Sequence, residues 1–226
     1  MKNFLKFSAV AAVLVASATF ASADTIYLGS NASSSPTYLT YLGYNPTIGS
    51  GTAVTAPAAS PLVYNLTPST PWGSAIAGSS WISYNPNTSP TGSLAPANGD
   101  YVYQLTFNVE SASDYAGTLQ LQADDTVAVY LNGIEIVTPT AIGSDTNCSD
   151  GVPTCTSVYS TLFGSAEDPL YEGANTLTFV VEQTGGYAEG LDFLVDTSAV
   201  PEPNTLLLLG TGLLGSAGAL FRRMRS

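Results

Sequence analysis

Residues 119–136 read LQLQADDTVAVYLNGIEI, and this stretch decides the fold. Apolar residues occupy every second position over 119–123 and again over 127–131. Alternation with a period of two is typical of strands that bury one face and leave the other in water. Asn132-Gly133 follows the second run, and Asn-Gly between alternating runs predicts a β-hairpin with a type I′ turn, because both turn residues need positive φ.

The same period recurs further along the chain, in 101–109, 177–181 and 191–195. Residues 25–28 predict an opening strand and residues 80–84 another. The sequence shows no convincing helical period between its two ends, and it contains 21 Gly and 14 Pro. These features predict an all-β protein, an antiparallel jelly-roll-like β-sandwich.

The first part of this sandwich is the least regular. Prolines lie among Ser, Thr, Gly and Ala residues between the predicted strands at 25–28 and 80–84. Such composition predicts long loops and short edge strands. We assign residues 24–199 to one sandwich domain with a loop-rich first part at 24–98, because single sandwiches of up to about 200 residues are normal.

The N-terminus predicts a signal peptide. Lys2 and Lys6 precede an apolar segment at 7–20, and residues 21–23 read ASA. A basic region, an apolar helix and an A-x-A site are the parts of a secretory signal, so we predict a signal helix at 1–23 and its removal after export.

The C-terminal segment, 200–226, has three parts. In order, they are Pro201-Glu202-Pro203, an apolar run at 206–221, and Arg222, Arg223 and Arg225. As a helix, the apolar run is about 24 Å long, slightly short of the roughly 20 residues usual for a membrane span. We predict a C-terminal transmembrane helix with its arginines on the cytoplasmic side. The alternative, a buried helix of a soluble domain, lacks the polar face that such a helix shows.

This arrangement resembles the PEP-CTERM sorting signal of Gram-negative bacteria. The resemblance covers only the tail. It implies export, a transient anchor in the inner membrane, and processing near the tripeptide by an exosortase-type enzyme. It also implies a final location at the cell surface or outside the cell, in a family that often accompanies exopolysaccharide and biofilm production.

Every basic residue lies in the two terminal segments. The chain has five Lys and Arg and no His, and all five fall within 1–23 and 200–226. Of its 17 acidic residues only Glu202 lies outside the predicted domain, which therefore keeps 16 acids and no cation. Nucleic acid is excluded as a partner because phosphate binding needs cations. The absence of cations also disfavours anionic lipid surfaces.

The missing basic residues also limit the chemistry. Without His, Lys or Arg, the domain has no Ser-His-Asp triad, no Cys-His pair and no lysine nucleophile. Paired carboxylates for glycoside hydrolysis remain as an alternative. We predict that the protein is not an enzyme.

Cys148 and Cys155 lie in a polar segment with Gly and Pro. Two cysteines that close a short loop in an exported protein predict a disulfide. A metal site made by the two thiols is the alternative.

The order of motifs in about 80–195 resembles galactose-binding-domain-like jelly rolls. The motifs are Trp-Ile at 81–82, Ala-Asp-Asp at 123–125, V-x-V-x-L-N-G at 127–133 and G-x-N-x-L at 173–177. The resemblance implies the fold more than any ligand, and the segment 148–155 looks like an insertion.

Two candidate binding sites follow. Asp124 and Asp125 are adjacent carboxylates that predict part of a Ca²⁺ site; alternatively, they make turn hydrogen bonds. Trp72, Trp81 and Tyr84 are candidates for stacking on sugar rings; alternatively, they belong to the core and the sheet faces.

We therefore expect an exported, non-catalytic protein of the cell surface or extracellular matrix. The alternative function is a carbohydrate-binding module with a Ca²⁺-supported sandwich, whose partner is extracellular polysaccharide.

Overall fold

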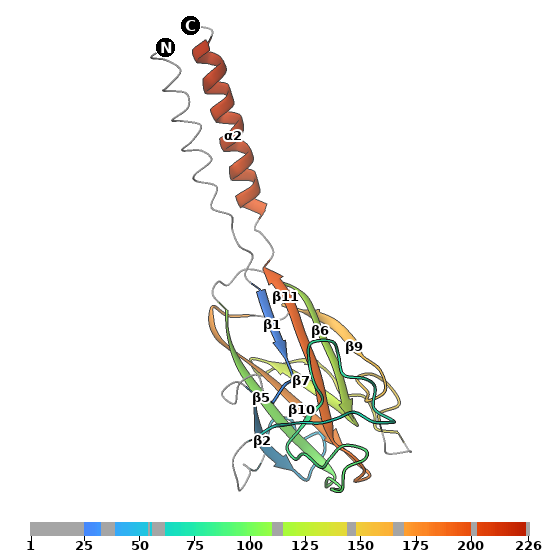
Figure 1. Cartoon of the computed structure of the whole chain (residues 1–226). Helices are drawn as coiled ribbons and strands as arrows, with labels where there is room; N and C mark the ends of the chain where they lie inside the picture. The colour runs from blue at the N-terminus through green and yellow to red at the C-terminus, as the bar shows by residue number, and fades with distance from the viewer. Residues whose placement is uncertain are drawn as a thin grey trace.

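The structure is a computed structural model. It describes residues 25–32, 39–53, 55, 62–109, 115–143, 148–164, 170–199 and 203–224. The predicted signal peptide at 1–23 lies outside these residues, as do Pro201, Glu202 and Arg225. Two antiparallel sheets face each other as a sandwich (Figure 1), which confirms the predicted fold class.

The first sheet, sheet A, has six strands. Its order is β3 (Tyr64–Asn65), β4 (Ile82–Ser83), β11 (Gly190–Ala199), β6 (Tyr115–Asp124) and β9 (Tyr159–Phe163), and β1 (Thr25–Gly29) also pairs with β11. Sheet B has the order β2 (Leu39–Asn45), β5 (Gly99–Val109), β10 (Gly173–Gln183), β7 (Thr126–Leu131) and β8 (Ile134–Val137).

The main core lies between the two sheets. Inward-facing residues of each strand alternate with outward-facing ones, as the sequence period requires. Phe179 of β10 and Phe193 of β11 stack across the interface with ring centroids 4.3 Å apart. A smaller apolar cluster of Val102, Ala128 and Val180 lies apart from this core and is also buried.

The predicted hairpin is confirmed. Asn132 and Gly133 have φ angles of 51° and 84° between β7 and β8, as a type I′ turn demands. The Asn132 side chain also fastens the turn to β10, since its Oδ1 accepts a bond of 2.9 Å from the Thr176 N–H. Its Nδ2 donates to Asn175 Oδ1, also at 2.9 Å.

Residues Pro203–Met224 form helix α2, which extends away from the sandwich (Figure 1). Arg222 and Arg223 lie in its last turn. We predicted a transmembrane helix here, but among the residues that the structure describes no helix is long and apolar enough to cross a membrane.

Candidate functional site

The site lies where the chain passes from one sheet to the other. Asp124 is the last residue of β6 in sheet A, and Thr126 is the first residue of β7 in sheet B. Asp125 alone joins them. The segment 148–155 packs against this crossing, because the Ser149 N–H donates to the Asp125 carbonyl at 3.1 Å. The Ala123 N–H donates to the Thr154 carbonyl at 3.2 Å.

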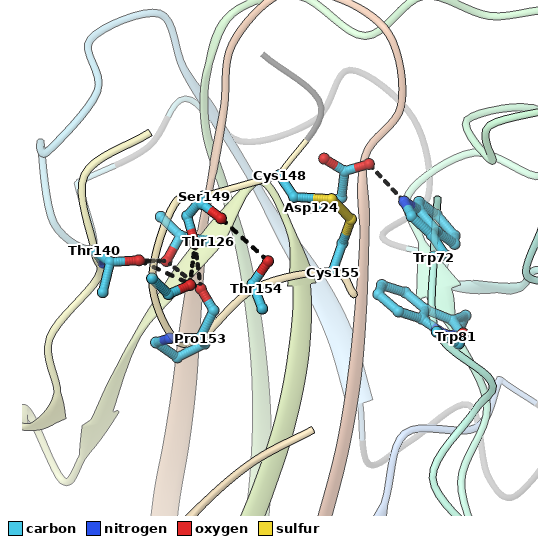
Figure 2. Close-up of a disulfide and its surroundings, with 12 residues drawn as sticks. Trp72, Trp81, Asp124, Thr126, Thr140, Cys148, Ser149, Pro153, Thr154 and Cys155 are labelled. Atoms are coloured by element: carbon cyan, nitrogen blue, oxygen red, sulfur yellow. Dashed lines mark hydrogen bonds between the residues drawn. A yellow bond between two sulfur atoms is a disulfide. The ribbon is translucent and has the colours of Figure 1, made fainter. Parts of the chain in front are cut away.

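A disulfide closes the packed segment, as predicted. Cys148 and Cys155 are bonded and buried. Figure 2 shows hydroxyl groups converging on the carbonyl of Pro153, with Thr126 Oγ1 at 2.9 Å and Ser149 Oγ at 2.7 Å. The Gly73 N–H also donates to the Cys155 carbonyl at 2.8 Å. These bonds fix the loop against both β7 and the long segment before β4.

Two tryptophans pack beside the disulfide. Trp72 and Trp81 stack with ring centroids 4.2 Å apart and planes inclined by 17° (Figure 2). Trp81 is completely buried and Trp72 is 6 % exposed. Trp81 Nε1 donates to the Gly73 carbonyl at 3.1 Å. Gly190 lies under the Trp72 ring, where a Cβ atom would come within 2.5 Å of the ring, so this position requires glycine.

This burial argues against the predicted role of the tryptophans in sugar binding. A sugar ring stacks on an exposed aromatic face, and these two indoles pack against each other in the interior. Tyr84 is half-buried and stacks on Tyr41 and Tyr101, with centroids 5.4 and 4.8 Å away. The three candidates therefore belong to two aromatic clusters of the fold. This placement favours the alternative that they are residues of the core and the sheet faces.

Asp124 is the polar centre of the site. Its Oδ2 accepts a bond of 2.5 Å from Trp72 Nε1, and its Oδ1 is buried with no hydrogen-bond partner. Burial raises the pKa of Asp124 to about 9. The Trp72 N–H opposes this shift, and the neighbouring Asp125 and Glu189 carboxyls add to it. The shift favours the protonated, neutral form of Asp124 at pH 7.

Glu189 and Asp192 lie buried at the same end of the β6–β11 pair, where Gly190 is opposite Asp124 and Asp192 is opposite Gln122. Ser83 Oγ and Tyr103 Oη donate to Glu189, the latter at 2.8 Å. Burial raises the pKa of Glu189 to about 8, although both hydroxyl bonds oppose the shift. Asp192 accepts from Ser30 Oγ at 2.9 Å and from the Ile76 N–H at 2.8 Å. Burial also raises the pKa of Asp192.

Buried acids without cations are the outstanding property of the domain. We call the following six residues the buried carboxylates: Asp100, Asp124, Asp125, Glu182, Glu189 and Asp192. Proteins usually pair a buried charge or neutralise it. Because residues 24–200 contain no Lys, Arg or His, pairing with a side-chain cation of the domain is impossible. Hydroxyl and N–H donors take the place of cations at these side chains, as at Asp100, Asp125, Glu189 and Asp192.

The surroundings of Asp124 do not fit a Ca²⁺ ion. Calcium takes six to eight oxygen ligands. Among the described residues, the metal-ligating groups that lie within 4.8 Å of each other and include Asp124 are Cys148 and Cys155, whose sulfurs are bonded to each other. Oδ2 of Asp124 already accepts the hydrogen bond from the Trp72 N–H. Asp125 Oδ2 is held by the N–H and hydroxyl of Thr184, at 2.7 and 3.1 Å.

The sequence predicted a Ca²⁺ site or turn hydrogen bonds for Asp124 and missed its contact with Trp72. The signal that a search could have used is the pair of tryptophans, since a buried indole N–H needs an acceptor. Nothing in the sequence spacing brings Trp72 to Asp124, which lie 52 residues apart.

Comparisons with solved structures find other β-sandwich modules. A family 35 carbohydrate-binding module from Clostridium thermocellum is 14 % identical, with 60 % of this chain and 89 % of that chain covered and a TM-score of 0.33. The CBM36-1 domain of a xylanase from the hindgut metagenome of Trinervitermes trinervoides is 10 % identical, with 73 % and 98 % covered and a TM-score of 0.33. Such low scores transfer neither ligand nor activity to this chain.

A β-glucosidase from Kluyveromyces marxianus is 12 % identical, with a TM-score of 0.33. The match covers 74 % of this chain but only 16 % of the enzyme. A search of curated protein sequences found no match. Residues 199–225, however, match the model of the PEP-CTERM protein-sorting motif. The tail of this chain is therefore a PEP-CTERM sorting segment, as its sequence predicted.

Proposed function

We propose that this chain is an exported, non-catalytic protein that the PEP-CTERM segment delivers to the cell surface or the extracellular matrix of a Gram-negative bacterium. The match of residues 199–225 to the sorting motif carries this proposal. In it, the sorting segment as a whole holds the chain transiently at the inner membrane, and an exosortase-type enzyme cuts near Pro201-Glu202-Pro203. A role in an exopolysaccharide or biofilm layer belongs to the same proposal.

The described carboxylates support a non-catalytic role. Glycoside hydrolysis needs two carboxyl groups about 5–10 Å apart and facing the substrate. The acids that the structure exposes lie on separate elements. They are Glu135 on β8, Asp150 in the disulfide loop, Glu172 before β10 and Asp196 on β11. The buried carboxylates are inaccessible to a polysaccharide.

Replacement of Pro201, Glu202 and Pro203 by Ala together should block processing. In a host that makes an exosortase, we expect wild-type protein to lose its tail and the triple variant to keep it, as mass spectrometry of the C-terminal peptide will show. Ser198→Ala, an exposed change on β11, is the matched control and should be processed normally. Tail peptide in all surface-exposed wild-type material would contradict the proposal.

Binding of a neutral polysaccharide is the second candidate function. The observation that favours it is the exposure of two loop tyrosines, Tyr171 and Tyr187, which show about half of their surface to solvent. Exposed aromatic faces can stack on sugar rings, and the absence of cations disfavours acidic sugars. In this proposal the sugar contacts Tyr171 and Tyr187 instead of the buried Trp72 and Trp81.

A pull-down with the host's own polysaccharide tests this second function. A double variant with both Tyr171 and Tyr187 replaced by Ala should bind more weakly than wild type. We expect a loss of roughly threefold to tenfold for each ring removed, which is the usual contribution of one aromatic contact. Ile134→Ala removes an equally exposed side chain that cannot stack, and it should bind as wild type does. Equal retention of all three proteins, or no retention of wild type, would rule out tyrosine-mediated binding.

A further inference from the structure

Two cysteines are held beside Asp124 by backbone bonds that do not involve their sulfurs. The residue after Cys148 donates its N–H to the Asp125 carbonyl at 3.1 Å. The residue before Cys155 accepts a bond of 3.2 Å from the Ala123 N–H through its carbonyl. These two bonds flank Asp124 along the chain. Both cysteines are therefore kept next to it whether or not their sulfurs are bonded to each other.

The three side chains converge in the interior of the domain. Both Sγ atoms and a carboxyl oxygen of Asp124 lie within 4.8 Å of one another, and all three residues are buried. Figure 2 shows the Asp124 carboxyl beside the bond between Cys148 and Cys155, with Trp72 on the other side. Trp72 holds Oδ2, while the buried Oδ1 has no hydrogen-bond partner. Asp124 thus keeps one oxygen that can bind a cation next to the two sulfurs.

The thiol state of the cysteines completes this set of ligands. A dithiol reductant supplies two electrons and two protons, the S–S bond breaks, two thiols form, and the reductant becomes a disulfide. The chain also begins in the thiol state, because cysteines are kept reduced in the cytoplasm. A thiolate is a metal ligand, and thiolates favour zinc over calcium or magnesium.

The spacing of the three ligands fits zinc. Zinc binds cysteine sulfur at about 2.3 Å and carboxylate oxygen at about 2.0–2.2 Å in a tetrahedron, so its two sulfur ligands lie about 3.8 Å apart. Starting from a disulfide of about 2.05 Å, each sulfur has to move by only about 0.9 Å. The Cα atoms of Cys148 and Cys155 are 5.5 Å apart, which allows both side chains to reach one ion.

Charge also favours a cation at this position. Two thiolates and one carboxylate carry three negative charges, and residues 24–200 contain no Lys, Arg or His that could balance them. We infer that, in the thiol state, Cys148, Cys155 and Asp124 bind one divalent cation of the zinc class. The two thiol protons and any proton on Asp124 pass to water as the ion binds.

In this site, Trp72 orients the Asp124 carboxyl through its bond to Oδ2, and water takes the fourth position around the ion. The disulfide and the ion exclude each other, because each uses both sulfurs. All three ligands belong to the sandwich, so the site is independent of the proposed sorting route.

Co²⁺ is the probe for this site, because its sulfur-to-metal absorption band reports thiolate ligands and ignores metal bound at surface acids. The full chain is purified in detergent, reduced with a dithiol, and separated from the reductant without air. We expect one Co²⁺ per chain with this band, loss of the band when Zn²⁺ is added, and no band in the disulfide form. A reduced wild-type chain without the band overturns the inference.

Asp124→Asn tests the carboxylate separately from the thiols. The amide still accepts the Trp72 N–H but is a poor metal ligand. Competition with Co²⁺ should show an affinity for Zn²⁺ at least tenfold lower, because even loss of an outer-shell partner costs about 10–100-fold. Glu172→Gln removes an exposed carboxylate and should bind Zn²⁺ as wild type does. Equal affinity in Asp124→Asn and wild type, or an equal loss in Glu172→Gln, overturns the inference.

Discussion

The sandwich domain should lose stability steadily as the pH rises from about 5 to about 8, and it should be most stable in weak acid. Asp124 and Glu189 have pKa values of about 9 and about 8 in the folded chain, against 3.8 and 4.5 as ordinary values. At a pH between the ordinary pKa and the folded-state pKa, the unfolded chain has released both protons and the folded chain still holds them. The free energy of unfolding therefore falls by about 1.4 kcal/mol per pH unit for each group.

Asp124→Asn tests this directly. An amide imitates the protonated carboxyl and still accepts the Trp72 N–H, but it does not titrate. We expect the variant to reduce the pH slope by about 1.4 kcal/mol per unit and to be at least as stable as wild type at pH 8. Urea unfolding across the pH range measures both quantities.

Glu172→Gln is the matched control, because it removes one negative charge at an exposed position. It should leave the slope unchanged. A wild-type domain that becomes more stable between pH 5 and pH 8 would show that the buried acids are ionised in the folded state.

Trp81→Ala should cost about 3–5 kcal/mol of unfolding free energy, the usual range for removal of a large buried aromatic side chain. The substitution leaves a cavity beside Trp72, removes the stacked contact of 4.2 Å and leaves the Gly73 carbonyl without its donor. Urea unfolding followed by far-ultraviolet circular dichroism measures the loss without relying on tryptophan fluorescence.

Two comparisons frame this result. Trp81→Phe keeps part of the ring packing and should lie between wild type and Trp81→Ala. Tyr187→Ala removes an exposed ring and should stay within about 0.5 kcal/mol of wild type. A Trp81→Ala protein with wild-type stability would mean that the ring is not part of the core.

The sequence predicted the strands with clear alternation and missed those without it. The runs at 101–109, 119–123 and 127–131 fall within β5, β6 and β7, because each buries one face and keeps the other polar. Strand β9 was missed, although Tyr159, Thr161 and Phe163 alternate with Ser160 and Leu162, because it follows the cysteine loop and carries an apolar residue on its outer face. Strand β2, an edge strand of sheet B, lies in the part for which the prolines predicted long loops and short edge strands without a position for either.

The candidate site was predictable only in its local chemistry. The disulfide needs two cysteines at a short spacing, which the sequence shows. The environment of Asp124 depends on Trp72, 52 residues away, and that of Glu189 on Ser83 and Tyr103, 106 and 86 residues away. Contacts over such separations come from the sheet order, which strand periodicity does not determine. For the same reason the sequence could not show that Trp72 and Trp81 stack inside the domain.

The position of β11 has a consequence for how an exported chain acquires its fold. This last strand pairs with β6 along one side and with β1 and β4 along the other, so that Thr25 is opposite Ser198. A chain that crosses a membrane with its N-terminus first cannot complete sheet A until residues near 199 have emerged. Strands β1, β4 and β6 lack their pairing partner β11 until then, because these contacts join residues far apart in the sequence. Sheet A of the precursor therefore stays incomplete until residues just before the sorting segment have crossed the membrane, and its completion comes late in export.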